Sequence, residues 1–427
     1  MKLLHLKLLT TTLLLSSAAS AATLDSLLKD LKSPEQTTRQ NALDELSELS
    51  EEGFTEKEGL KILDAAAGKY AANGEYSINA ELVSFLREKP SPKLIQPLVA
   101  LFPKLDADAK WYALDVLAYM EGSKDALKTY LGLVGKHSAT LDGLPVSALK
   151  EQKDAVKILF PTLFQYTRNP KLQYDIYDLA LEYVYEDWMS IADLRRAEAG
   201  ILNDYRTLAT RLNPAQQTTG IAWRWQEPYL DDRYLGGLML DLIGFLNTRN
   251  ANQVLQDALK FNDPYLQGWA VISLAYNDQK IPAEAVKQVA ASNEMRWTLY
   301  DYLQDAEHLD LFPAEYRNQQ DMGASDLVNV LIDSDELGYE PESVEFVQKF
   351  TRQEGSSLYD YYLYKFTDHE GTAYAGLAGP YSPARVVTIE GGDDTSTLFT
   401  RWEEKSPEAH YQAILDDLYG ESEDDLE

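Results

Sequence analysis

The sequence predicts a mainly α-helical fold, an α-α superhelix of antiparallel helix pairs that is followed by a small C-terminal antiparallel β module. Two observations predict this class. Apolar residues recur at spacings of three and four from residue 22 to residue 311, which is the period of helices that bury one face. Beyond residue 312 the apolar runs become aromatic and β-branched and are separated by glycines, which is typical of short strands.

Residues 1–21 have the pattern of a secretory signal peptide. Lys2 and Lys7 supply positive charge, and residues 8–15 are largely apolar. Residues 19–21 (Ala-Ser-Ala) fit the rule for peptidase cleavage. No later stretch reaches the roughly 18 consecutive apolar residues that a membrane span needs. We therefore expect an exported protein, periplasmic or extracellular, without a membrane span.

In the helical region, five dipeptides place a capping side chain before a proline. They are Ser33-Pro34, Ser91-Pro92, Asn169-Pro170, Asn213-Pro214 and Asp263-Pro264. The side-chain oxygen can accept a hydrogen bond from a free amide of the first helical turn, and a proline at the first helical position sacrifices no hydrogen bond. Each pair therefore predicts the start of a helix after a tight turn.

Three of the predicted helices share one spacing, in which a long polar residue lies three positions before an alanine and a leucine lies four after it. The sets are Arg39–Ala42–Leu46, Lys110–Ala113–Leu117 and Gln267–Ala270–Leu274. Weaker copies centre on Ala80 and Ile176. An alanine allows a neighbouring helix to approach closely, and the leucine fills the groove beside it. The spacing predicts a repeated helix pair.

This pattern resembles HEAT-type repeats, in which an Asp-Pro or Ser-Pro turn leads to a polar residue and then to Ala and Leu on the packed face. The helices between Gly143 and Gly220 depart from it. The resemblance implies a curved stack of helix pairs whose surface binds a partner, with no catalytic chemistry.

The second predicted region, residues 312–405, is a β-rich module. Its predicted strands are Val344–Phe350, Leu358–Phe366, Thr372–Ala378, Arg385–Ile389 and Thr397–Trp402. Residues 368–371 and 391–394 predict hairpin connections, and Gly379-Pro380 predicts a further turn. Residues 406–427 predict a last helix and an acidic tail. The sheet either covers the end of the helix stack or forms a module of its own.

Composition and motifs exclude several kinds of site. The chain has 69 acidic and 39 basic residues, a formal net charge of −30 and no cysteine. Such a charge repels nucleic acid, although it also serves plain solubility, and the lack of cysteine excludes disulfides and thiolate metal sites. Residues 333–338 resemble a calcium loop, but Leu337 and Val344 occupy positions that need oxygen ligands. We expect no cofactor, no metal and no nucleic-acid partner.

The most distinctive segment combines aromatic rings with carboxylates. Its residues are Trp223, Trp225, Glu227, Tyr229, Asp231 and Asp232, and Trp188 belongs to a similar group upstream. Rings flanked by acids suit stacking against sugars and also suit protein interfaces. Three interpretations stay open. The rings can fill the core while the two aspartates cap a helix, the group can be a binding surface, or paired carboxylates can cleave glycosides.

These observations together predict an exported, non-catalytic scaffold that engages a protein or peptide partner through the surface of the helix stack. The alternative is a glycan-active hydrolase or lyase on an α/α toroid, in which Glu227, Asp231 or Asp232 act as paired carboxylates.

Overall fold

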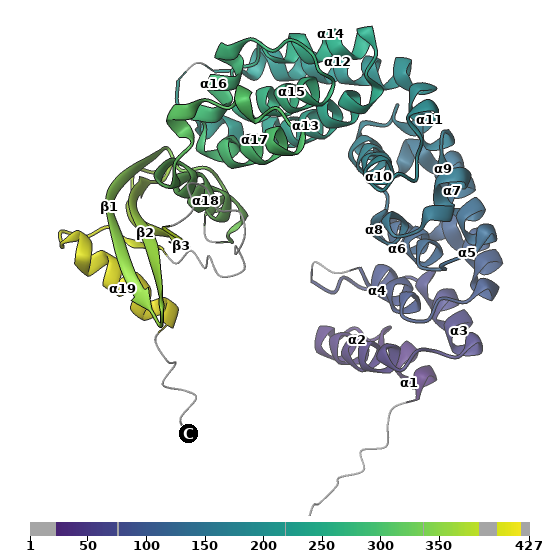
Figure 1. Ribbon diagram of the computed structural model, residues 1–427. Helices are drawn as coiled ribbons and strands as arrows, with labels where there is room; N and C mark the ends of the chain where they lie inside the picture. The colour runs from purple at the N-terminus through teal and green to yellow at the C-terminus, as the bar shows by residue number, and fades with distance from the viewer. Residues whose placement is uncertain (1–22, 75–76, 218, 336, 384–398, 420–427) are drawn as a thin grey trace, which may run out of the picture. The chain divides into compact units, whose positions relative to one another are not determined.

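The computed structural model describes residues 23–74, 77–217, 219–335, 337–383 and 399–419. It confirms the predicted class, a mainly α-helical chain with a small antiparallel sheet at the C-terminal end (Figure 1). The chain forms two compact units, an N-terminal unit (Met1–Leu159) and a C-terminal unit (Phe160–Glu427). The predicted signal peptide (1–21), the predicted strand at 385–389, the hairpin at 391–394 and the tail at 420–427 lie outside the described residues.

The N-terminal unit is a double layer of short helices. They are α1 (Leu24–Asp30), α2 (Gln36–Glu51), α3 (Glu56–Ala66), α4 (Ile78–Ser84), α5 (Ile95–Leu101), α6 (Ala107–Ala118), α7 (Lys124–His137), α8 (Ser147–Lys150) and α9 (Val156–Leu159). Helix α4 packs on α3 and α6, and α7 packs on α5, α6 and α9. Even-numbered helices thus form one layer and odd-numbered helices the other.

The helical part of the C-terminal unit repeats this plan with longer helices. They are α10 (Gln173–Tyr185), α11 (Ile191–Arg195), α12 (Glu198–Ala215), α13 (Tyr229–Leu246), α14 (Arg249–Ala258), α15 (Pro264–Tyr276), α16 (Ala283–Ala291), α17 (Asn293–Asp305) and α18 (Gln319–Asp333). Helices α10, α13, α15, α17 and α18 contact one another in that order. Helices α12, α14 and α16 form the second layer, and each packs on its neighbours in the first.

The small residues predicted at the helix crossings are buried. Ala42 exposes 2% of its surface, and Ala113 and Ala270 expose none. Gly244 of α13 has the same role, because a Cβ added there would lie 2.6 Å from the Ser273 hydroxyl of α15. Close approach of these helices therefore depends on the absence of a side chain at that point.

The long polar residue of the repeated spacing also has a structural role. The Arg39 guanidinium donates to the carbonyls of Ser33 and Pro34, both at 2.9 Å. Gln267 of α15 donates to the Leu259 carbonyl at the end of α14, at 3.1 Å. Arg296 of α17 likewise donates to the last carbonyls of α16, at 2.7 and 3.0 Å. Each side chain satisfies carbonyls that the end of the preceding helix, or the turn after it, leaves free.

The predicted helix starts are accurate at three proline pairs, α2 begins two residues after Pro34, at Gln36, and at Asn213-Pro214 the prediction is wrong. Ser91, Asn169 and Asp263 each accept a hydrogen bond from a first-turn amide, and Ser33 accepts one from the amide of Glu35 just before α2. Pro214 instead lies in the last turn of α12. A proline there removes one helical hydrogen bond and helps to end the helix rather than to begin one.

The β module is one antiparallel sheet in the order β1-β2-β3-β4, with a helix on each face. The strands are β1 (Ser343–Glu354), β2 (Ser357–Thr367), β3 (Ala373–Tyr381) and β4 (Phe399–Arg401). Tyr362, Tyr364 and Phe366 of β2 pack with residues of α18. Tyr361 and Leu363 point the other way and pack with α19 (Pro407–Tyr419). The alternation of β2 therefore fills two small cores.

Two details of this region differ from the sequence pattern. The first strand begins at Ser343, one residue before the predicted Val344, but residues 319–333 of the predicted β-rich module form α18, which continues the helix stack and packs on both α17 and β3. The predicted turn at Gly379-Pro380 is also wrong. Both residues lie within β3, where Tyr381 still pairs with Asp360 of β2 after a local irregularity.

Candidate functional site

Three of the aromatic residues predicted as a binding surface (Trp223, Trp225 and Tyr229) lie where α13 begins, whereas Trp188 lies just after the end of α10. Trp223 and Trp225 lie in a short 3-10 helix, η8 (Ala222–Trp225). Trp223 is buried against Tyr229, with ring centroids 4.8 Å apart. The Tyr229 hydroxyl donates to the carboxylate of Asp263 at 2.8 Å. Trp188 packs on Tyr183 of α10, with centroids 5.9 Å apart.

The predicted carboxylates lie on the surface beside these rings. The carboxyls of Glu227 and Asp231 are in hydrogen-bonding contact, and this contact raises the pKa of Glu227. Asp232 is bound by two nitrogens of Arg211, at 2.6 and 2.8 Å. Asp231 and Asp232 both lie in the first turn of α13. Pro228, the residue before this helix, makes no side-chain hydrogen bond to cap it. Negative charge at a helix N-terminus is stabilising in itself.

Behind these rings lies a buried ionic cluster that the sequence analysis did not identify. Arg233 of α13 is fully buried. It binds Asp263, the residue before α15, at 2.7 Å, and Glu294 in the first turn of α17, at 2.5 Å. The signal was present in the sequence, since Arg233 lies three residues before Gly236 and seven before Leu240. A glycine in place of the alanine concealed the repeated spacing.

The cluster also reaches the segment that leads into the β module. Arg224 of η8 binds Glu340, which is 7% exposed, at 3.1 Å. Burial, together with the negative charge of Glu294, raises the pKa of Glu340 to about 7. Three carboxyls (Asp263, Glu294 and Glu340) thus face two guanidinium groups, so near-neutral pH leaves a proton on this cluster.

The cluster shows that the N-terminal ends of α13, α15 and α17 lie together, and the opposite ends of these helices enclose a pocket. The pocket has a volume of about 560 Å³. Helices α10, α11, α13, α15 and α17 and the loops beside them contribute its lining, which is Val184, Tyr185, Asp187, Ile191, Arg195, Asp241, Gly244, Phe245, Asn247, Ser273, Tyr276, Asn277 and Tyr302. This volume is in the range of pockets that hold small ligands.

One carboxyl, that of Asp241, lies deep in this pocket. Asp241 is 8% exposed and accepts a hydrogen bond from the Tyr185 hydroxyl at 2.6 Å. Burial raises the pKa of Asp241 to about 6, although the bond from Tyr185 acts in the opposite direction. At neutral pH the group is therefore mostly an anion in a poorly hydrated place, which is costly unless a partner compensates it.

Aromatic rings surround this carboxyl. Tyr185 and Tyr276 are 47% and 50% exposed, which is unusual for large rings. Tyr185 packs edge-on against Phe245, with centroids 5.2 Å apart, and Tyr276 packs on Tyr302 at 6.3 Å. These exposed faces are available to a ligand.

Further acids bias the pocket toward positive ligands. Burial, followed by the charge of Asp305, raises the pKa of Tyr276 to about 12, and the charges of Asp241 and Asp301 add to the effect. Arg195 also lines the pocket, and its Nε donates to the Leu246 carbonyl at 2.8 Å.

The carboxylates predicted for glycoside cleavage do not reach this pocket. Asp231 lies ten residues before Asp241 on the same helix, a separation of about 15 Å along the axis. The contact between Glu227 and Asp231 is also shorter than the roughly 5 Å or more that separates the two catalytic carboxyls of glycosidases.

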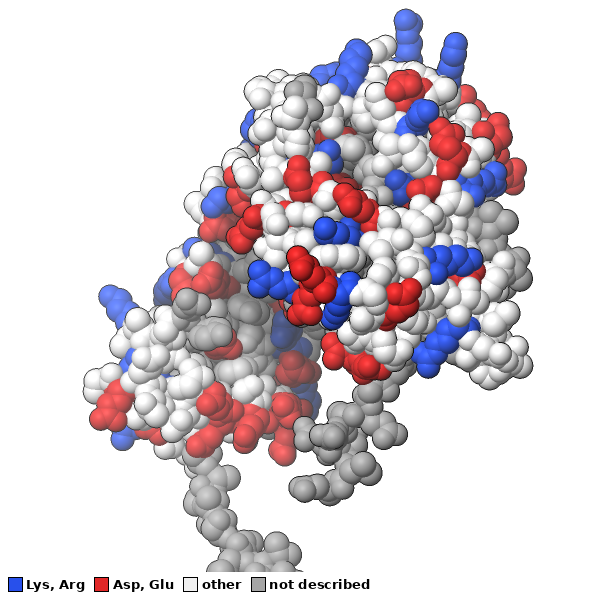
Figure 2. Space-filling model, turned by 90° about the vertical axis from the view of Figure 1, so that its left-hand side faces the viewer, with Lys and Arg blue, Asp and Glu red and all other residues white. Residues whose placement is uncertain are grey.

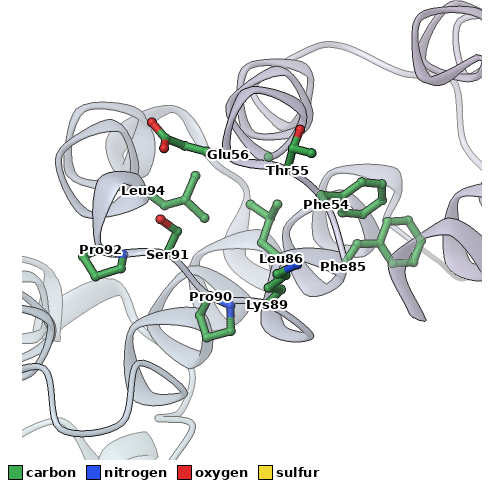
Figure 3. Close-up of a pocket in the computed structure, with 11 residues that line it drawn as sticks. Phe54, Thr55, Glu56, Phe85, Leu86, Lys89, Pro90, Ser91, Pro92 and Leu94 are labelled. Carbon is green, nitrogen blue, oxygen red and sulfur yellow. The ribbon is translucent and has the colours of Figure 1, made fainter. Parts of the chain in front are cut away.

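A second pocket, of about 380 Å³, lies in the N-terminal unit (Figure 3). It is formed by residues 54–59 and 85–94. Of its four polar side chains, all but that of Lys89 have structural partners among the described residues. Thr55 and Ser91 cap the helices α3 and η2 (Pro92–Leu94), and Glu56 binds Lys93 at 2.5 Å. The pocket therefore offers mainly apolar surface, and the pocket around Asp241 is the stronger candidate for a binding site.

Other kinds of site find no support among the described residues. They contain no group of three or more acids and histidines placed to hold a metal ion. No helix among them is long and apolar enough to cross a membrane. On the face shown in Figure 2, acidic and basic side chains are interspersed rather than gathered by sign.

Two comparisons of the sequence with known proteins return no match. No protein-family model matches the chain, and no curated protein is similar to it in sequence.

Proposed function

We propose that this protein is an exported, non-catalytic scaffold of HEAT-like helix pairs that binds a protein or peptide partner on the surface of its helix stack. The pocket around Asp241 is the binding site. The observation that carries the proposal is the pairing of half-exposed tyrosine rings with a buried carboxyl on well-packed helices.

The repeat assignment is supported by the positions that the sequence singled out. Ala42, Ala113 and Ala270 lie buried at helix crossings. Arg39 and Gln267, three residues earlier, bind carbonyls at or after the end of the preceding helix. Both features suit a stack of helix pairs in which each pair is fixed to its neighbour.

The rings favour binding over catalysis. Tyrosine supplies a large contact area with few rotatable bonds, and for that reason it is frequent at binding hot spots. The Tyr185 hydroxyl is occupied as the donor to Asp241.

Selection from a random peptide display library with the full-length chain tests this function. We expect the chain to retain a family of related peptides. Replacing Tyr276 by alanine should weaken their binding at least tenfold, as is usual for a central aromatic contact. Tyr119→Ala removes a ring that is 40% exposed just after α6 in the N-terminal unit, and this variant serves as the matched control. Failure to enrich any peptide, or equal losses in the two variants, would reject the proposal.

A further inference from the structure

We propose that the pocket receives a lysine or arginine side chain of the partner peptide, with Asp241 as its counter-ion and the rings of Tyr185, Tyr276 and Tyr302 around its stem. This inference rests on the proposed function and names the chemical group that the site recognises.

The first step of the argument is the state of Asp241. Its Oδ2 accepts the bond from Tyr185, and no lysine, arginine or histidine forms an ion pair with it within the described part of the chain. A buried anion without a counter-ion is destabilising, and a cation brought by a ligand removes that cost. The contrast with Arg233 is informative, since that buried charge has two carboxylate partners.

The second step is the shape and chemistry of the walls. Tyr185, Tyr276 and Tyr302 come from α10, α15 and α17, so three helices of one layer each present a ring to the pocket. Helix α13, which packs between α10 and α15, supplies Asp241. A cation within about 6 Å of such a ring is attracted by its negatively polarised face. The alkyl stem of lysine or arginine gains from contact with the same rings.

The third step is the field around the pocket. Tyr185 and Tyr276 are the last residues of α10 and α15, and helix C-termini carry partial negative charge. Asp187 lines the pocket, and Asp301 and Asp305 on α17 act on its tyrosines. Arg195 is the one basic residue of the described lining, and its Nε is bound to the Leu246 carbonyl. An anionic or neutral side chain would leave Asp241 unpaired, so a basic side chain is the occupant that this field selects.

Two display libraries separate this inference from the function on which it rests. One library is fully random and the other lacks lysine and arginine. We expect related binders from the first library only. Binders of equal affinity from both libraries would overturn the inference and leave the proposed function standing. If neither library yields binders, both are rejected.

A double-mutant cycle then tests the contact between the basic side chain of the peptide and Asp241. Calorimetric titration measures the affinities of the best selected peptide and of its uncharged analogue. Lysine is replaced by norleucine, or arginine by citrulline, which keeps the stem and removes the charge. The analogue should bind the native chain at least tenfold more weakly, and Asp241→Asn should abolish most of this difference. Asn keeps the shape of the side chain and can still accept the Tyr185 bond. Glu284→Gln, an exposed change on α16, is the charge-matched control. The inference fails if the analogue loses as much affinity in Asp241→Asn as in the native chain.

Discussion

At the scale of single residues, the chain places ionisable groups where their charge is costly. Asp241 and Glu340 are both more than nine-tenths buried, and burial is the main cause of the raised pKa of each. A site that binds a cation gains from such a group, because the ligand relieves a cost that the free protein carries.

The pH dependence of Asp241 follows from its pKa of about 6 in the folded chain against about 3.9 in an unfolded one. Between these values the folded chain binds more protons, so stability falls as the pH rises from about 4 to about 6. Asp241→Asn should therefore raise the free energy of unfolding by about 2–3 kcal/mol at pH 7.5 and by nearly nothing at pH 4. Urea unfolding followed by circular dichroism at both values measures this. A loss of stability at pH 7.5 would contradict the prediction.

The same titration should appear in binding. Protonation of Asp241 removes the counter-ion, so the affinity for a lysine-bearing peptide should fall about fivefold between pH 6 and pH 5, in proportion to the ionised fraction of this carboxyl. Calorimetry of one selected peptide across this range gives the profile. Asp241→Asn is expected to flatten it, whereas Glu284→Gln should leave it unchanged.

At the scale of elements, helices are joined by a few specific contacts, and Arg233 joins three helices. It binds the N-terminal ends of α15 and α17 from α13. Arg233→Met should lower the free energy of unfolding by about 3–5 kcal/mol, because it leaves Asp263 and Glu294 buried without a counter-ion. Arg211→Met removes the partly exposed partner of Asp232, which lies on α13 one residue before Arg233. This change should lower the free energy of unfolding by only about 0–1 kcal/mol. Similar losses in the two variants, measured by urea unfolding, would argue against this role.

Glycine has opposite effects at two helical positions. Gly244→Ala should destabilise the contact of α13 with α15, since its Cβ would lie 2.6 Å from the Ser273 hydroxyl. Gly200→Ala in α12 meets nothing within 4 Å. It should stabilise the chain by about 0.5–1 kcal/mol through helix propensity. Thermal melts of both variants test this pair, and a shift of the same sign in both would refute it.

Whether the sequence predicts a feature depends on how far apart along the chain the residues that form it lie. The burial of Ala42, Ala113 and Ala270 was predictable, because helix packing follows a short period along the chain. The pocket was not, because Tyr185, Tyr276 and Tyr302 meet only through the stacking of three helices. The one sign of the pocket in the local sequence is Asp241, an acid within an apolar helix.

At the scale of the whole molecule, the chain divides into two compact units, each with helices in two layers. In the C-terminal unit, Glu340 ties the approach to β1 to η8 through Arg224. Because the pKa of Glu340 is raised to about 7, folding takes up a proton at this carboxyl, and the carboxyl disfavours the folded unit more above neutrality than in mild acid.

The C-terminal unit should therefore be more stable at pH 5.5 than at pH 8, since both Asp241 and Glu340 hold more protons when folded than when unfolded. The double variant Asp241→Asn/Glu340→Gln should lose most of this dependence. Hydrogen exchange of α13 and α15 at both pH values measures it for this unit alone. An unchanged pH dependence in the double variant would contradict the assignment.

The position of β1 has a consequence for solubility at high concentration. Among the described strands, β1 pairs with β2 alone, so its other edge offers free amides and carbonyls along the strand. Such edges invite copies of a chain to join into continuous sheets. Glu345, Lys349 and Arg352 are exposed along this strand, and burying their charges between two copies would be costly. These charged side chains should oppose aggregation through this edge, and replacing them with neutral residues should promote self-association.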